Sequence, residues 1–245
     1  MLNAFFWGLL ATSSLVLGGI IASRFSLSKR AIGIILAFGA GTLISAVSYE
    51  LIYEAIKLGK GTGFAIFGFF SGAFTFYFAD MLIGKYRSRN QTSVNASQQS
   101  GLVVPMVLAI ILDGIPESIV IGLGIFEAGT VSLAMLVAVF ISNLPEALAG
   151  SSGMKSNGWS RAKIIFLWLI IALICAVSTV AGFSLFSAAS DHWLSFIQAF
   201  AGGAILMMLA NSMMPEAFDH GGKLAGVFTV FGFAVSVVMV VLENM

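Results

Sequence analysis

Long apolar runs, separated by short polar or glycine-containing breaks, constrain the fold of this chain more than any other feature. Charged residues make up 9% of the sequence, whereas about a quarter of an ordinary soluble domain is charged. So few charges cannot cover the surface of a soluble domain. Because about 20 apolar residues in a row are enough for a helix to cross a bilayer, the pattern predicts an all-α membrane protein.

Eight such runs can be placed, and they predict a single transmembrane domain over residues 1–245. The first run has no basic segment before it, so we expect a retained helix and not a cleaved signal peptide. Residues 85–100 are rich in Ser, Asn and Gln, and we expect a polar loop there. The expected spans are residues 4–22, 32–55, 63–84, 102–124, 129–150, 163–186, 194–216 and 223–243.

The basic residues predict how the chain is oriented. If the eight spans alternate across the bilayer, ten of the twelve Lys and Arg residues fall on one side. Cytoplasmic loops carry an excess of these residues, so both termini are expected outside and the 85–100 loop inside. The expected location is a plasma membrane, in a bacterium the inner membrane. The ten residues are Arg24, Lys29, Arg30, Lys85, Arg87, Arg89, Lys155, Arg161, Lys163 and Lys223.

Two adjacent runs each contain a proline followed by a glutamate, in ILDGIPESIVIG at residues 111–122 and SNLPEALAG at residues 142–150. A proline in a helix interior leaves one backbone carbonyl without its amide partner and bends the helix. Within a membrane this is tolerated where other groups or water satisfy the freed backbone. The two runs therefore predict a pair of kinked helices that share a polar path.

Carboxylates accompany both prolines. Asp113 and Glu117 are four residues apart and so lie on one face of a helix. Ionisable residues within a span indicate function by default. We predict a cation site made by Asp113, Glu117 and Glu146, with oxygen atoms of Ser142 and Asn143 nearby. The alternative is structural: two kinked helices held together by carboxyl groups that hydrogen-bond to one another.

Further acidic residues lie toward the ends of spans. The segments LIYEAIKLG around Glu54 and MMPEAFDHG around Glu216 are alike and end two expected helices of opposite direction. This predicts inverted repeats in a 3+2+3 arrangement, a recurring plan in transporters. Glu54 and Glu216 would then lie at the two opposite ends of a pathway, where each either attracts cations or simply caps a helix end. Asp80 lies a little over one turn before Lys85, which favours an ion pair at the membrane interface over a role in transport.

The order of the spans, the polar segment after the third and the paired Pro-Glu motifs resemble the ZIP family of divalent metal transporters. The resemblance covers nearly the whole chain. The fourth span of that family typically reads H-N-x-P-E-G. Here Asp113 takes the place of the His, Gly114 that of the Asn and Glu117 that of the Glu.

The fifth span of the family typically reads H-(N/D)-x-P-E-G. Ser142 takes the place of the His, Asn143 that of the Asn or Asp, and Glu146 that of the Glu. The resemblance implies transport of zinc or iron. With both motif histidines absent, the ligands are all oxygen, which favours manganese or another hard ion. The expected substrate is therefore a divalent metal (zinc, iron or manganese), and no prosthetic group is expected.

Other family features also differ. Some members bind a second metal through a sixth-span Glu, but the corresponding segment, residues 172–182, has no acidic residue, and Ser178 is the nearest candidate. The seventh-span acidic pair appears here as Asn211 and Ser212. His192 and His220, the two histidines, fall in expected loops and cannot ligate a metal at mid-membrane.

These features favour a metal ion transporter that works by alternating access toward the cytoplasm, with the lipid bilayer as its environment. Three alternatives remain: the same scaffold with another substrate, a non-transporting sensor or partner of another protein, and a channel. An intramembrane protease is disfavoured because no histidine lies within a span. No basic aromatic surface indicates nucleic acid. Gly68 and Gly72 could pack helices within a protomer or in a homodimer.

Overall fold

The computed structural model describes residues 1–25, 27–93, 103–185, 189–243 and 245. Within these ranges every regular element is a helix, and eight helical spans are long and apolar enough to cross a membrane. The prediction of an all-α protein with eight spans is therefore confirmed. The elements are α1 (Leu2–Arg24), α2 (Lys29–Ala46), η1 (Val47–Tyr53), α3 (Glu54–Gly59), α4 (Phe64–Ser93), α5 (Val103–Ala128), α6 (Leu133–Ser156), α7 (Arg161–Leu185), α8 (Asp191–Met208), η3 (Leu209–Met213), α9 (Met214–Gly221) and α10 (Lys223–Glu243).

Two of the spans contain a π-helical segment. The segment η1 joins α2 to α3 in the span Lys29–Gly59, and η3 joins α8 to α9 in the span Asp191–Gly221. Short π-helical segments are rare and frequently occur at functional sites. Glu54 begins α3 directly after one such segment, and Glu216 lies in the first turn of α9 after the other. The two sequence segments that resemble each other thus have the same local structure.

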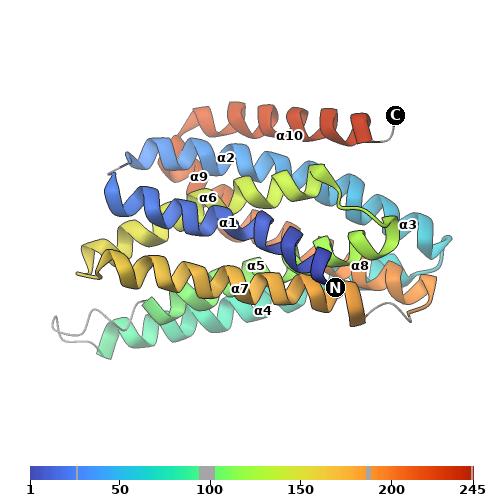
Figure 1. The fold of residues 1–245 in the computed structure, drawn as a ribbon, viewed down its shortest axis with the longest axis horizontal. Helices are drawn as coiled ribbons and strands as arrows, with labels where there is room; N and C mark the ends of the chain where they lie inside the picture. Colours follow the sequence, from blue (N-terminus) through green and yellow to red (C-terminus); the bar gives the residue numbers. More distant parts are fainter. Residues whose placement is uncertain (26, 94–102, 186–188, 244) are drawn as a thin grey trace.

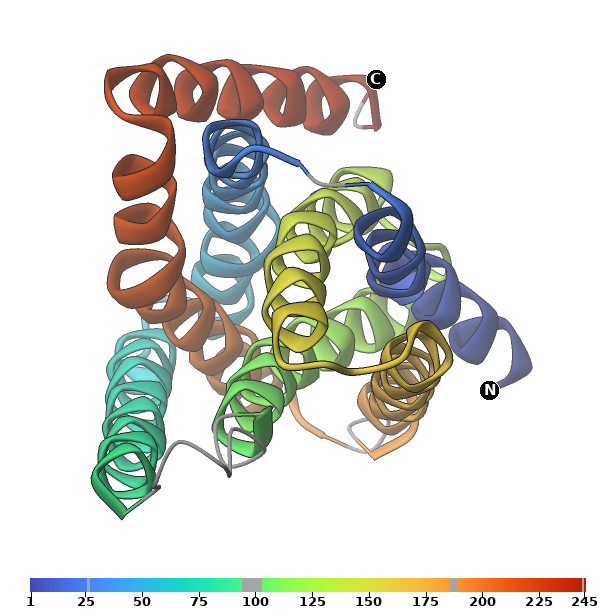
Figure 2. The ribbon, with the colours of Figure 1, turned by 90° about the vertical axis from the view of Figure 1, so that its left-hand side faces the viewer.

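The helices form two groups (Figures 1 and 2). In the first group, α1 packs along α6 and α7, and α7 packs along α5. In the second group, α10 packs along α2 and α4 packs along α8. The groups meet mainly where α2 packs on α6. Both ends of the chain lie at the same end of the bundle (Figure 1).

The polar segment after the third span differs from the expectation. The helix α4 continues through Ser93, so the first half of the expected 85–100 loop is helical, while residues 94–100 lie outside the described residues. No Gly or Pro interrupts the sequence from Lys85 to Ser93, and its Lys, Arg and Gln residues are compatible with a helix. A polar composition therefore marked where the apolar span ends and not where the helix ends.

Glycines allow the helices of the second group to approach closely. A Cβ atom on Gly72 of α4 would collide with the backbone carbonyl of Phe200 on α8, and one on Gly41 of α2 would collide with the carbonyl of Thr229 on α10. Such small residues drive helix packing in membranes, where burial of apolar surface gives no net gain. Gly68 likewise faces the backbone of α8. Because Gly68 and Gly72 pack within the protomer, they give no support to a homodimer.

Replacement of Gly72 by Ala is expected to push α4 away from α8 and lower the melting temperature of the purified protein. Overpacking of this kind costs about 1–3 kcal/mol, measurable by thermal unfolding in detergent. Gly153→Ala is the matched control, because a Cβ atom there would meet nothing within 4 Å and Ala favours a helix. Equal melting temperatures for Gly72→Ala and wild type would contradict the close α4–α8 packing.

Candidate functional site

A cavity of about 380 Å³ enters the bundle between the two groups of helices. Four carboxylic acids line it, each from a different helix: Asp80 of α4, Asp113 of α5, Glu146 of α6 and Glu216 of α9. The cavity reaches the surface beside Gly84 and Glu216, which are exposed. Most of its other lining residues are apolar or small. The tertiary fold therefore gathers acidic side chains from distant parts of the sequence around one opening.

Asp80 is a cavity residue that the sequence analysis assigned to another role. Within the described residues no ion pair joins Asp80 to Lys85, because five residues of helix turn the two side chains toward different sides. Instead, Asp80 continues the spacing of Gly72 and Phe76, which both face the interior. That four-residue spacing was the signal in the sequence that could have placed Asp80 inside the bundle.

Glu117 lies deeper than the cavity wall. Only 1% of its surface is exposed, and neither carboxylate oxygen has a hydrogen-bond partner among the described residues. The same holds for Oε2 of Glu146 and for Nδ2 of Asn143. Native proteins rarely leave buried polar atoms unpaired, and each such atom costs about 1–3 kcal/mol. The three carboxylate oxygens are therefore available to water or to a cation, whereas Nδ2 of Asn143 can only donate a hydrogen bond.

Pro145 within α6 brings backbone polarity to the interface with α2. Pro145 has no amide hydrogen, so the carbonyl of Ile141 lacks its usual helical partner. This carbonyl faces Gly39 of α2, where a Cβ atom would stand 3.3 Å from it. The hydroxyl of Ser142 donates to the carbonyl of Val139 at 3.0 Å, which leaves its oxygen able to accept. The freed carbonyl and the hydroxyl both lie within two turns of Glu146.

The predicted carboxylate ligands are neighbours without forming a closed cluster. Within the described ranges, no three His, Cys, Asp or Glu side chains lie close enough together to hold one metal ion. Asp113 and Glu146 share the cavity wall, and Glu117 is buried beside it. The Glu146 carboxylate lies within electrostatic range of both, and also of Glu216. In a low-dielectric interior, like charges on these groups would repel strongly, and a bound proton or a cation would offset that repulsion.

The four residues expected along the pathway have different positions. Glu216 lines the cavity, and its Oε1 atom lies 3.9 Å from Nδ1 of His220. Asn211 is exposed and does not line the cavity, whereas the adjacent Ser212 does. Of the pair that takes the place of the family's seventh-span acids, Ser212 is therefore the one beside the cavity.

The other two pathway candidates lie away from the cavity. Glu54 forms an ion pair with Lys57, with 2.8 Å between Oε1 and Nζ, and 42% of the glutamate side chain is exposed. The hydroxyl of Ser178 donates to the carbonyl of Ile174 at 3.0 Å, within its own helix. Neither residue lines the cavity. Both side chains already have partners that stabilise local structure.

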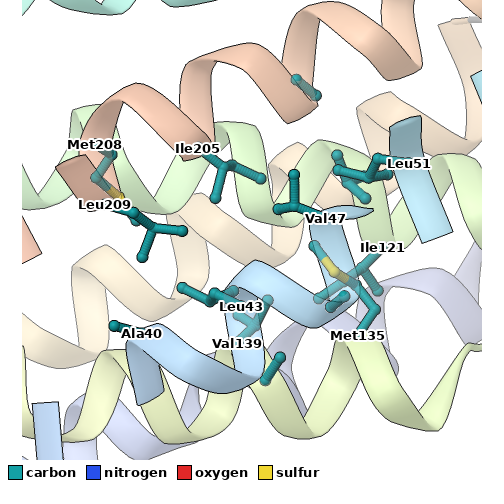
Figure 3. Close-up of a cluster of buried hydrophobic side chains, with 14 of the residues drawn as sticks. Ala40, Leu43, Val47, Leu51, Ile121, Met135, Val139, Ile205, Met208 and Leu209 are labelled. Carbon is teal, nitrogen blue, oxygen red and sulfur yellow. The ribbon is translucent and has the colours of Figure 1, made fainter. Parts of the chain in front are cut away.

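An apolar cluster closes the end of the cavity that lies deepest in the bundle (Figure 3). Met208 lines the cavity on one side of the cluster, while Leu51 and Met135 line a pocket of about 40 Å³ on the other. Glu50 and Ser132 belong to that small pocket. The apolar cluster consists of Leu43, Val47, Leu51, Ile121, Met135, Val139, Ile205, Met208 and Leu209. The large cavity and the small pocket are thus separated by apolar side chains.

Comparison with known proteins gives two informative relatives, although no family model matches the chain. A protein of Arabidopsis thaliana, provisionally named as a zinc transporter, is 25% identical over 191 residues, which cover 77% of this chain and 30% of that protein. The zinc transporter GufA of Myxococcus xanthus is 25% identical over 225 residues, 87% of each chain. The chain therefore spans less than a third of the Arabidopsis relative but most of the bacterial one. Eight apolar helices and these relatives define a multi-pass membrane protein.

Divalent cations are expected to stabilise the purified protein through the cavity carboxylates. A ligand at about 100 times its dissociation constant adds about 2.7 kcal/mol of stability, so the melting temperature should rise on addition of Zn²⁺ or Mn²⁺. Glu146→Gln removes a cavity charge and should abolish most of that rise. Glu54→Gln, outside the cavity, should keep it. An equal rise in both variants would show that the ions bind elsewhere.

Proposed function

We propose that this protein is a ZIP-like transporter of divalent metal ions and not an enzyme. The observation that carries the proposal is the cavity lined by Asp80, Asp113, Glu146 and Glu216 within a bundle of apolar membrane helices. Carboxylates are expensive in such surroundings and mark ion pathways when they face a cavity. Both relatives carry the name of a zinc transporter, provisionally in the case of the Arabidopsis protein, and these names support the same class of function.

The proposed metal ligands are the carboxylates of Asp113, Glu117 and Glu146, assisted by oxygen atoms of Ser142 and Asn143. Two of the carboxylates already line the cavity, and the third has both oxygens unpaired. A divalent cation would offset the repulsion between them, so that their side chains converge on the ion. Glu216 and Asp80, nearer the opening, would attract the ion or receive it on release.

The direction of the pathway follows from the proposed topology. Ten of the twelve Lys and Arg residues belong to the end of the bundle where α4 ends and α5 begins, and we propose that this end faces the cytoplasm of a plasma membrane. Both chain ends then lie outside. The carboxylate-lined cavity is open to the cytoplasm, and the apolar cluster closes the outer side. During uptake by alternating access, the outer side would open while the cytoplasmic side closes, and the reverse change would follow.

The 3+2+3 plan with inverted repeats also belongs to the proposal. The packing of α10 along α2 has a counterpart in the packing of α4 along α8, and the packing of α6 along α1 has one in that of α5 along α7. The π-helical segments η1 and η3 occupy corresponding spans. Such pairing supports a central site between the two repeats, where α5 and α6 carry the carboxylates.

Zinc is the first substrate to test, because both relatives are named for it. Zinc accepts carboxylate ligands, although its protein sites usually contain nitrogen or sulfur. A site of oxygen atoms alone also suits manganese and ferrous iron. We therefore expect a transporter with broad selectivity among divalent ions.

The test is uptake into proteoliposomes of Zn²⁺, Mn²⁺, Fe²⁺, Co²⁺, Cd²⁺ and Mg²⁺, with and without a pH gradient. At least one ion should be taken up at a rate that saturates with concentration. Glu117→Ala and Glu146→Ala should each lower uptake at least tenfold. Glu54→Ala, whose carboxylate pairs with Lys57 outside the cavity, should remain close to wild type.

Three outcomes would overturn parts of the proposal. Absence of uptake for every ion in a folded preparation would favour another substrate or a non-transporting sensor on the same scaffold. Normal uptake by both Glu117→Ala and Glu146→Ala would show that the proposed ligands are wrong. Fast flux that does not saturate would favour a channel over a carrier.

A further inference from the structure

The last turn of α10 is tied to the first turn of α6 through Glu243. One carboxylate oxygen accepts hydrogen bonds from the backbone amides of Leu133 and Ala134, the latter at 3.3 Å. The other accepts from the hydroxyl of Ser132 at 3.2 Å. Ser132 also caps α6 by accepting from the amide of Met135 at 3.1 Å. Glu243 therefore satisfies amides at a helix start that would otherwise lack partners.

This contact joins the two groups of helices, since α10 belongs to one and α6 to the other. Two other interhelical hydrogen bonds each lie within one group. The indole of Trp168 donates to Ser151 between α7 and α6 at 2.7 Å. The hydroxyl of Ser195 on α8 donates to the carbonyl of Ala55 on α3 at 2.6 Å. Apolar side chains fill much of the boundary between the groups, and Glu243 adds a directional, charge-assisted contact across it.

The contact also lies beside the small pocket and far from the large cavity. Ser132 lines the small pocket beyond the apolar cluster, at the end of the bundle opposite the large cavity. Glu50 lines the same pocket and lies within electrostatic range of Glu243. Its negative charge opposes the approach of Glu243, so the contact depends on the donors at the start of α6 and on the partial positive charge of that helix end.

We propose that Glu243 is a latch that holds this end of the bundle closed while the carboxylate-lined cavity is open at the other end. The inference rests on the alternating access proposed above. Separation of the two groups at this end must break the bonds from Ser132, Leu133 and Ala134. Loss of the Glu243 carboxylate then favours the state in which the small pocket is accessible and the large cavity is closed.

The latch can be tested by reagent accessibility in purified, detergent-solubilised protein. Cys175, the single cysteine, is first replaced by Ser. A reporter cysteine is then placed at Val131, which lines the small pocket, or at Ala149, which lines the cavity. Glu243→Ala should label at least threefold faster than its parent at residue 131 and more slowly at residue 149, with a fluorescent maleimide as the probe.

Controls separate a latch from general destabilisation. A partly unfolded variant would label faster at both reporters, whereas the latch predicts opposite changes. Asp191→Ala removes an acid that pairs with Lys60 within one group, at 3.6 Å, and should change neither rate. Glu243→Gln keeps an acceptor but loses the charge, so its rates should be intermediate. Unchanged labelling at residue 131, or faster labelling at both reporters, would overturn the latch.

The labelling test needs no transported ion, so its outcome is independent of the uptake test. Opposite changes at the two reporters without uptake of any ion would leave the latch standing and remove the proposed transport function. If the wild type takes up an ion but the labelling rates do not change on loss of Glu243, the latch alone is ruled out.

Discussion

The cost of holding carboxylates inside an apolar bundle is the constraint on which the rest of this structure depends. The bilayer offers no water to backbone polar groups, so the chain must be helical across it. It offers none to Asp113, Glu117 or Glu146 either. The fold therefore keeps a cavity beside these side chains, and it leaves several of their oxygens free of protein partners. A cation would complete what the protein itself does not supply.

Departures from regular helix geometry are concentrated in the four most buried spans. Pro116 and Pro145 interrupt the hydrogen bonding of α5 and α6, and π-helical segments interrupt the spans of α2 and α8. The peripheral helices α4 and α10 have neither feature and are attached through glycine contacts. Irregular backbone is tolerated in a membrane where it lines a cavity. The distribution of irregular and regular helices thus follows the distribution of polar groups.

The division into two groups of helices connects the cavity to movement. Close glycine contacts hold helices together within each group, whereas apolar side chains and the Glu243 contact occupy much of the boundary between them. Apolar surfaces can separate and re-form without a geometric requirement, because they contain no directional bonds. A directional contact such as that of Glu243 instead favours one arrangement. Together, an apolar boundary and the Glu243 contact would allow the two groups of helices to alternate between two discrete arrangements.

The sequence by itself determined that the protein is helical and has eight spans, because apolar length is a local property. It also drew attention to Asp113 and Glu146, because a carboxylate near a proline is conspicuous within an apolar run. The tertiary structure decided which acids share a cavity. It brought in Asp80 and Glu216, left Glu54 in a local ion pair, and kept Glu117 behind the cavity wall. It also continued α4 to Ser93. These outcomes depend on the rotation of each helix against its neighbours, which close packing sets and which spacing along one helix does not reveal.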